Sequence, residues 1–75
     1  MDFIIEFEQE IDGRWIAEIS ELPGVMAYGV TQMQAGEKAK ALALRVLAER
    51  IESESAMPGI NNIAFSSRNE PVAVN

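Results

Sequence analysis

The sequence contains no cysteine and no histidine. Without cysteine, neither a disulfide nor a thiolate-bound metal can support the fold. Without either residue, the Ser/His/Asp and Cys/His arrangements that activate a nucleophile cannot form. The chain has five glycines in 75 residues, but no glycine-rich phosphate-binding loop follows a predicted strand. We therefore expect no catalytic activity, no cofactor and no metal centre.

Long hydrophobic runs are missing as well. No apolar stretch approaches the roughly 20 residues that a membrane-spanning helix needs. The first six residues, MDFIIE, lack the basic region and the apolar stretch of a secretory signal peptide. The sequence therefore predicts a cytoplasmic protein with no membrane association.

The chain is short, and we expect a single domain over residues 1–75. A domain of this size buries only about 60% of the surface that its unfolded chain exposes. Many such domains fold alone, but those without disulfides or metals often gain stability by association. The length favours a homo-oligomer, a dimer or larger, or a complex with another protein.

Negative charge is concentrated at the start of the chain. Residues 1–21 carry seven acidic side chains and one basic side chain, Arg14, and so account for the whole net charge of −6. The remaining residues carry five of each sign, and their basic side chains are dispersed. This pattern disfavours direct nucleic-acid binding and favours a basic protein partner. The alternative is that the charge serves solubility alone.

Two strands joined by a hairpin are predicted first. Apolar and polar residues alternate over 3–9 and again over 15–20, a period typical of strands with one buried face. Asp12 and Gly13 between them are a strong hairpin signal. Leu22, Pro23 and Gly24 then predict a turn, because proline fixes φ and glycine permits a reversal.

A third strand over 25–30 and a long helix follow. Thr31 and Gln34 have the spacing of a capping box, in which each side chain accepts a hydrogen bond from the other residue's backbone N–H. The helix is expected to run from Gln32 to Glu52, and a short strand over 62–65, with a possible extension to Val72 and Val74, ends the chain. The order β-β-β-α-β predicts an α+β fold, an antiparallel sheet with one long helix packed on one face.

The sheet face away from this helix is predicted to be acidic. Glu6, Glu8 and Glu18 share it with Ile4 and Ile16, and Glu10 lies in the same hairpin. We predict that the glutamates, Glu6, Glu8, Glu10 and Glu18, form a partner-binding surface through charge complementarity. The alternatives are a solvated sheet face and, less favoured, a divalent-cation site in a surviving nuclease.

The helix has two apolar stripes. The first, expected to face the sheet, comprises Ala35, Ala39, Leu42, Ala43 and Val46, and the second comprises Leu44, Leu47, Ala48 and Ile51. Together they span about 200° of the helix, roughly twice the usual stripe of a surface helix. We predict an oligomer interface at Leu44, Leu47 and Ile51; the alternative is a deep core beneath the end of the chain.

The first half of the chain resembles the N-terminal domain of HicB-like antitoxins. The residues that carry the resemblance are Asp12, Gly13, Trp15, Ala17, the motif Leu22, Pro23, Gly24, and the later Gly29, Thr31 and Ala35. The pattern departs from the family at several polar positions, with Glu21, Val25, Val30, Met33 and Gln34 in their place.

The resemblance implies a degenerate RNase H-like fold without catalytic activity. It also implies oligomerisation, and binding to a small basic RNA-cleaving toxin so as to cover its active surface. Full-length members carry a C-terminal DNA-binding domain, which is expected to be absent here. Two hypotheses follow: an antitoxin-like binding module, or a self-associating structural or adaptor module with an unrelated partner.

Overall fold

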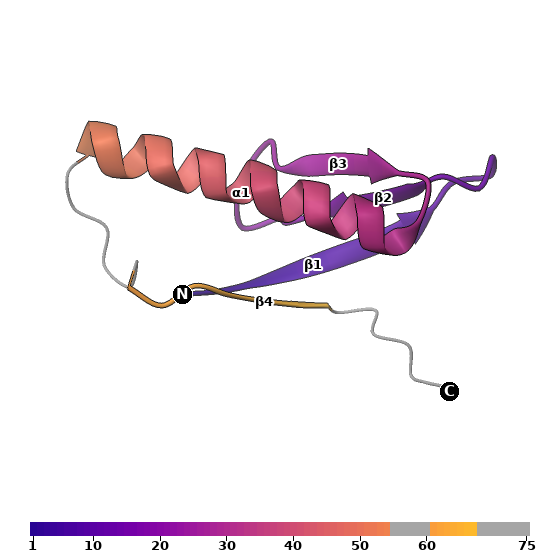
Figure 1. Cartoon of the computed structure of the whole chain (residues 1–75), viewed down its shortest axis with the longest axis horizontal. Helices are drawn as coiled ribbons and strands as arrows, with labels where there is room; N and C mark the ends of the chain where they lie inside the picture. Colours follow the sequence, from indigo (N-terminus) through magenta and orange to yellow (C-terminus); the bar gives the residue numbers. More distant parts are fainter. Residues whose placement is uncertain (55–60, 68–75) are drawn as a thin grey trace.

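The computed structural model describes residues 1–54 and 61–67. Its elements are β1 (Asp2–Gln9), β2 (Trp15–Glu18), β3 (Met26–Gly29), α1 (Gln32–Glu54) and β4 (Ala64–Ser67). One long helix lies on one face of a four-stranded sheet (Figure 1). The predicted α+β class and the order β-β-β-α-β are confirmed. The suggested extension to Val72 and Val74 lies outside the described residues.

The strand order in the sheet is β3-β2-β1-β4. β1 pairs antiparallel with β2 and β2 antiparallel with β3, but β4 runs parallel to β1. The sheet is therefore mixed rather than wholly antiparallel as predicted. The cause is the length of α1: 23 residues rise about 34 Å along the helix axis. The helix thus returns the chain to the end of the sheet at which β1 begins (Figure 1).

The hairpin between β1 and β2 depends on Gly13. Its N–H donates to the Glu10 carbonyl at 2.9 Å, and the Glu10 N–H donates to the Arg14 carbonyl at 2.7 Å. Gly13 has φ of +96°, a conformation that glycine adopts without strain. Residues 11–13 thus form a three-residue loop, in which a tight turn is followed by a left-handed glycine.

The residues of the Leu-Pro-Gly motif have structural roles. Leu22 is buried in the core, and the Val25 N–H donates to its carbonyl at 3.1 Å. Gly24 has φ of +86°, and Pro23 is exposed at the turn. The Ile19 N–H donates to the Val25 carbonyl at 3.1 Å, which closes the loop between β2 and β3.

The start of α1 is capped by Thr31, whose Oγ1 accepts from the Gln34 N–H at 3.0 Å. The return bond differs from the prediction by one residue: Gln34 Oε1 accepts from the Val30 N–H at 2.7 Å, not from Thr31. Gly29 lies directly beneath this turn, where an added Cβ would come within 2.4 Å of the Ala35 backbone N. Only glycine leaves room for the helix to begin so close to β3.

The core lies between α1, the inner face of β1 and β2, and the loop that joins β2 to β3. Its buried residues are Phe3, Ile5, Ala17, Ile19, Leu22, Val25, Ala35, Ala39, Ala43 and Leu47. The small side chains of Ala35, Ala39 and Ala43 allow the helix to lie close to the strands. α1 packs most closely against β3 and β2 and is offset from β1, although Phe3 and Ile5 of β1 belong to the same core. The described part of the chain therefore leaves the β1–β4 half of this sheet face partly uncovered.

Candidate protein-binding site

The acidic residues gather on the sheet face turned away from α1, which we call the open face. Ile5, Phe7 and Ala17 point toward the helix side, so their neighbours along the strands point to the other side. Strand register places Glu6 directly opposite Glu18, and Glu8 directly opposite Ile16. The predicted grouping of Glu6, Glu8 and Glu18 is thus what the sheet produces, and Glu10 follows at the end of β1.

The pairing of Glu6 with Glu18 is unfavourable for the sheet itself. Side chains directly opposite each other have Cβ atoms about 5 Å apart, and like charges in such pairs destabilise the strands. Glu8 and Glu18 are exposed, whereas Glu6 and Glu10 are half-buried. Sheet stability therefore does not account for this arrangement.

Apolar side chains share the open face with the glutamates. The Glu18 position is opposite Met26, and Ile16 is opposite Tyr28. Met26 and Tyr28 are 46% and 44% exposed, and Ile4 and Ile16 are half-buried. No helix or strand in residues 1–54 and 61–67 lies over them. The open face is therefore partly apolar as well as acidic.

Arg14, the one base among residues 1–21, is already engaged. Its backbone N–H donates to Asp12 Oδ1 and its Nε to Asp12 Oδ2, both at 3.0 Å. The guanidinium carbon lies 5.0 Å from the centre of the Tyr28 ring, within the range of a cation–π contact. The backbone N–H of Arg14, helped by the guanidinium charge, lowers the pKa of Asp12 below its usual value.

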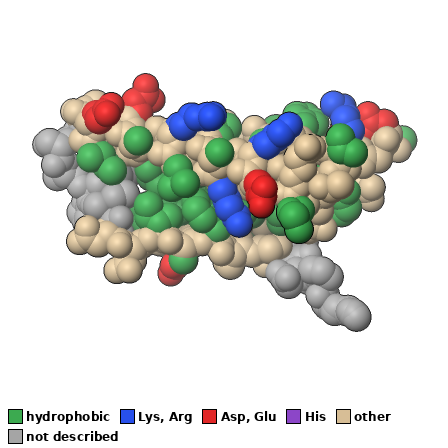
Figure 2. Space-filling model, in the orientation of Figure 1, with side chains coloured by type: hydrophobic (Ala, Val, Ile, Leu, Met, Phe, Trp, Pro, Cys, Tyr) green, Lys and Arg blue, Asp and Glu red, His purple; other side chains and the backbone are tan. Residues whose placement is uncertain are grey.

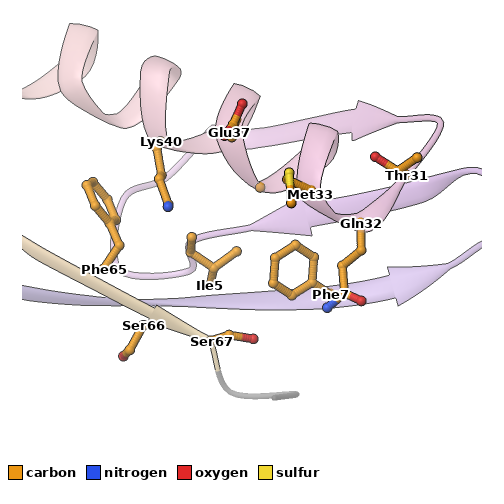
Figure 3. Close-up of a pocket in the computed structure, with 11 residues that line it drawn as sticks. Ile5, Phe7, Thr31, Gln32, Met33, Glu37, Lys40, Phe65, Ser66 and Ser67 are labelled. Carbon is orange, nitrogen blue, oxygen red and sulfur yellow. The ribbon is translucent and has the colours of Figure 1, made fainter. Parts of the chain in front are cut away.

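A second surface is a groove between the first half of α1 and the β1–β4 half of the sheet. It has a volume of about 920 Å³. Hydrophobic side chains gather along this strip (Figure 2). In Figure 3 Ile5, Phe7, Phe65 and Met33 surround it, and Lys40 extends over it from α1. Ser67 also lines it, and its hydroxyl oxygen is buried without a hydrogen-bond partner among the described residues.

The three residues predicted for the oligomer interface do not share one environment. Leu44 and Ile51 are 47% and 41% exposed, whereas Leu47 is only 2% exposed. Leu47 is part of this chain's own core and offers no surface to a partner. Met33 is 74% exposed and, at 100° per residue, lies within about 20° of Leu44 and Ile51 on the helix surface. These three residues form the exposed apolar stripe of α1, which the exposed Glu37 and Lys40 interrupt between Met33 and Leu44.

Several residues of these surfaces were missed in the sequence. Met26 and Tyr28 could have been assigned to the open face from the alternation within the third strand, 25–30. The partnership of Arg14 with Tyr28, in contrast, depends on the pairing of β2 with β3. The groove could not be anticipated, because it depends on how far α1 lies to one side of the sheet.

Comparison with known proteins adds no assignment: no protein family, no curated protein and no solved structure matches the chain. Among the described residues, no three acidic side chains are grouped so that they could hold a metal ion. No helix in the described part of the chain has the length and apolar character needed to cross a membrane.

Proposed function

We propose that this chain is a non-catalytic protein-binding module whose open face binds a basic protein. The observation that carries the proposal is the grouping of Glu6, Glu8 and Glu18 on one sheet face, with two carboxylates directly opposite each other. Charge complementarity of this kind accelerates association and disfavours wrong partners. Apolar side chains beside the glutamates supply contact area that charge alone does not.

The finer proposal is an antitoxin-like role, in which the partner is a small basic RNA-cleaving toxin and the open face covers its active surface. A protein that cleaves RNA must hold phosphates with cationic side chains. An acidic sheet face competes for the same cations and thereby excludes RNA. The resemblance in the Leu22–Thr31 region supports this role, as does the confinement of the surplus charge to residues 1–21.

The test is to purify this protein with any small basic protein encoded beside its gene and to measure both affinity and ribonuclease activity. We expect Glu8→Gln with Glu18→Gln to weaken binding by about tenfold to a hundredfold at low salt and to restore RNA cleavage. The matched control is Glu37→Gln with Glu49→Gln, which removes two exposed carboxylates from α1. Equal loss of binding in both double variants would count against the open face.

A second candidate function is self-association as a structural or adaptor module. The exposed apolar stripe of α1, formed by Met33, Leu44 and Ile51, favours it. If the stripe joins two copies, Leu44→Asp with Ile51→Asp should give a folded monomer in light scattering. The control is Ile11→Asp with Val30→Asp, since both residues are exposed and apolar but lie off the stripe. A native chain that is already monomeric at high concentration would exclude this function.

A further inference from the structure

Where β1, β2 and β3 pair with one another, the open face is divided into an apolar half and an acidic half; Ile4, earlier on β1, lies beside this region and pairs with Ser66 of β4. Met26 and Tyr28 on β3, with Ile16 on β2, form the apolar half, and Glu6 and Glu8 on β1, with Glu18 on β2, form the acidic half. We propose that this face recognises an amphipathic, arginine-bearing helix of the basic partner. This inference rests on the proposed function and adds to it the chemistry of the recognised segment.

The rows of the sheet match the width of one helix. One row runs from Met26 through Glu18 to Glu6, and the next runs from Tyr28 through Ile16 to Glu8. β3 and β1 are separated by two strand spacings, about 10 Å in all. A helix with its side chains is about 10–12 Å across. A single helix along the strands can therefore place apolar side chains over β3 and cationic side chains over β1.

Arg14 shows that this face accepts a guanidinium. The group lies 5.0 Å from the centre of the Tyr28 ring and pairs with the Asp12 carboxylate. The ion pair is solvent-exposed on both sides, with the two side chains 54% and 57% accessible, and such pairs contribute little to stability. The guanidinium of Arg14 therefore occupies a position that a partner's arginine can take in its place. A planar guanidinium fits both the Tyr28 ring and a pair of carboxylates.

A merely basic chain would not satisfy the whole face. Met26 and Tyr28 leave nearly half of their surface in water, and their burial requires apolar side chains from the partner. Cationic side chains alone would engage the glutamates and leave these two residues exposed. The apolar half therefore distinguishes an amphipathic helix from a disordered basic segment.

The experiment uses two synthetic peptides of about 18 residues, or five helical turns. One has leucines at i, i+3, i+4 and i+7 spacing flanked by arginines, and the other has the same composition in scrambled order. We expect the amphipathic peptide to bind about tenfold more tightly. Tyr28→Ala should remove that advantage and leave binding of the scrambled peptide unchanged, whereas the control Val30→Ala should leave both unchanged. Arg14→Ala should tighten binding of both, because a competing cation is removed.

The outcomes separate the two proposals. If both peptides bind equally and Tyr28→Ala affects neither, the open face recognises charge alone. The proposal of an amphipathic helix is then wrong, and the proposal that the acidic face binds a basic protein is retained. If neither peptide binds at low salt and no basic protein binds, the proposed function itself is wrong. Weaker peptide binding after Arg14→Ala, in a variant with a native circular dichroism spectrum, would contradict the claim that a partner's arginine displaces Arg14.

Discussion

At the scale of single residues, the fold depends on positions where backbone atoms come unusually close. Gly29 is the clearest case, because an added Cβ would lie 2.4 Å from the Ala35 backbone N and 2.9 Å from its Cα. Backbone atoms at the start of a capped helix cannot yield as the end of a flexible side chain can. Gly36 differs, since an added Cβ there would meet the Phe7 ring at 3.1 Å.

We therefore predict that Gly29→Ala destabilises the protein by about 1–3 kcal/mol, the usual cost of overpacking. Gly36→Ala is the control: the Phe7 ring can shift, and alanine gains about 1 kcal/mol of helix propensity over glycine. Urea unfolding of the two variants and the parent chain gives both values. Equal changes in stability at the two positions would show that the close approach of the helix backbone is not what requires glycine at position 29.

The charge state of Asp12 gives a second prediction at this scale. Its pKa is lowered first by the hydrogen bond from the Arg14 backbone N–H and then by the guanidinium charge. A lowered pKa in the folded state means that ionised Asp12 favours folding above the pKa of the unfolded chain. That contribution is lost as the pH falls through the folded pKa.

Arg14→Ala should raise the pKa of Asp12 only part of the way to its usual value, because the backbone N–H remains. Arg14→Pro removes the N–H as well and should raise the pKa further. Carboxyl chemical shifts followed by NMR during an acid titration measure both. Complete recovery of the usual pKa in Arg14→Ala would assign the effect to the guanidinium instead.

At the scale of elements, the local signals were reliable because each depends on neighbouring residues. Alternation over 3–9 and the Asp12–Gly13 signal predicted the first hairpin, and Thr31 predicted the start of α1. The parallel pairing of β4 with β1 and the offset of α1 toward β3 have no local signal. Leu47 was assigned to an oligomer interface because spacing along the helix shows which face a residue lies on. Spacing does not show which other part of the chain covers that face.

The Thr31 cap gives the prediction at this scale. Thr31→Ala removes the acceptor for the Gln34 N–H and should cost about 1 kcal/mol of stability. Thr31→Ser keeps the hydroxyl and should cost much less. Thermal unfolding of the two variants separates the lost hydrogen bond from any effect of the methyl group. Similar losses in both would mean that the cap contributes little.

At the scale of the whole molecule, residues 1–54 and 61–67 leave two faces incompletely covered by one another. α1 covers the β2–β3 half of one sheet face and leaves the groove beside it, and the opposite face is open and acidic. The sequence predicted the acidic face, because alternation and charge can both be read along a strand. The apolar half at Met26 and Tyr28 was missed, although alternation within 25–30 could have indicated it, and the groove could not be predicted because it arises only when distant segments are brought together.

The central claim is that the open face, not the helix side, meets the partner. The most direct test is NMR chemical-shift mapping of the isotope-labelled chain as a small basic ribonuclease is added at low salt. We predict that shift changes concentrate at Glu6, Glu8, Ile16, Glu18 and Tyr28 and diminish as salt is raised. Shift changes confined to α1 and to the groove residues Met33, Lys40 and Phe65, insensitive to salt, would contradict the account.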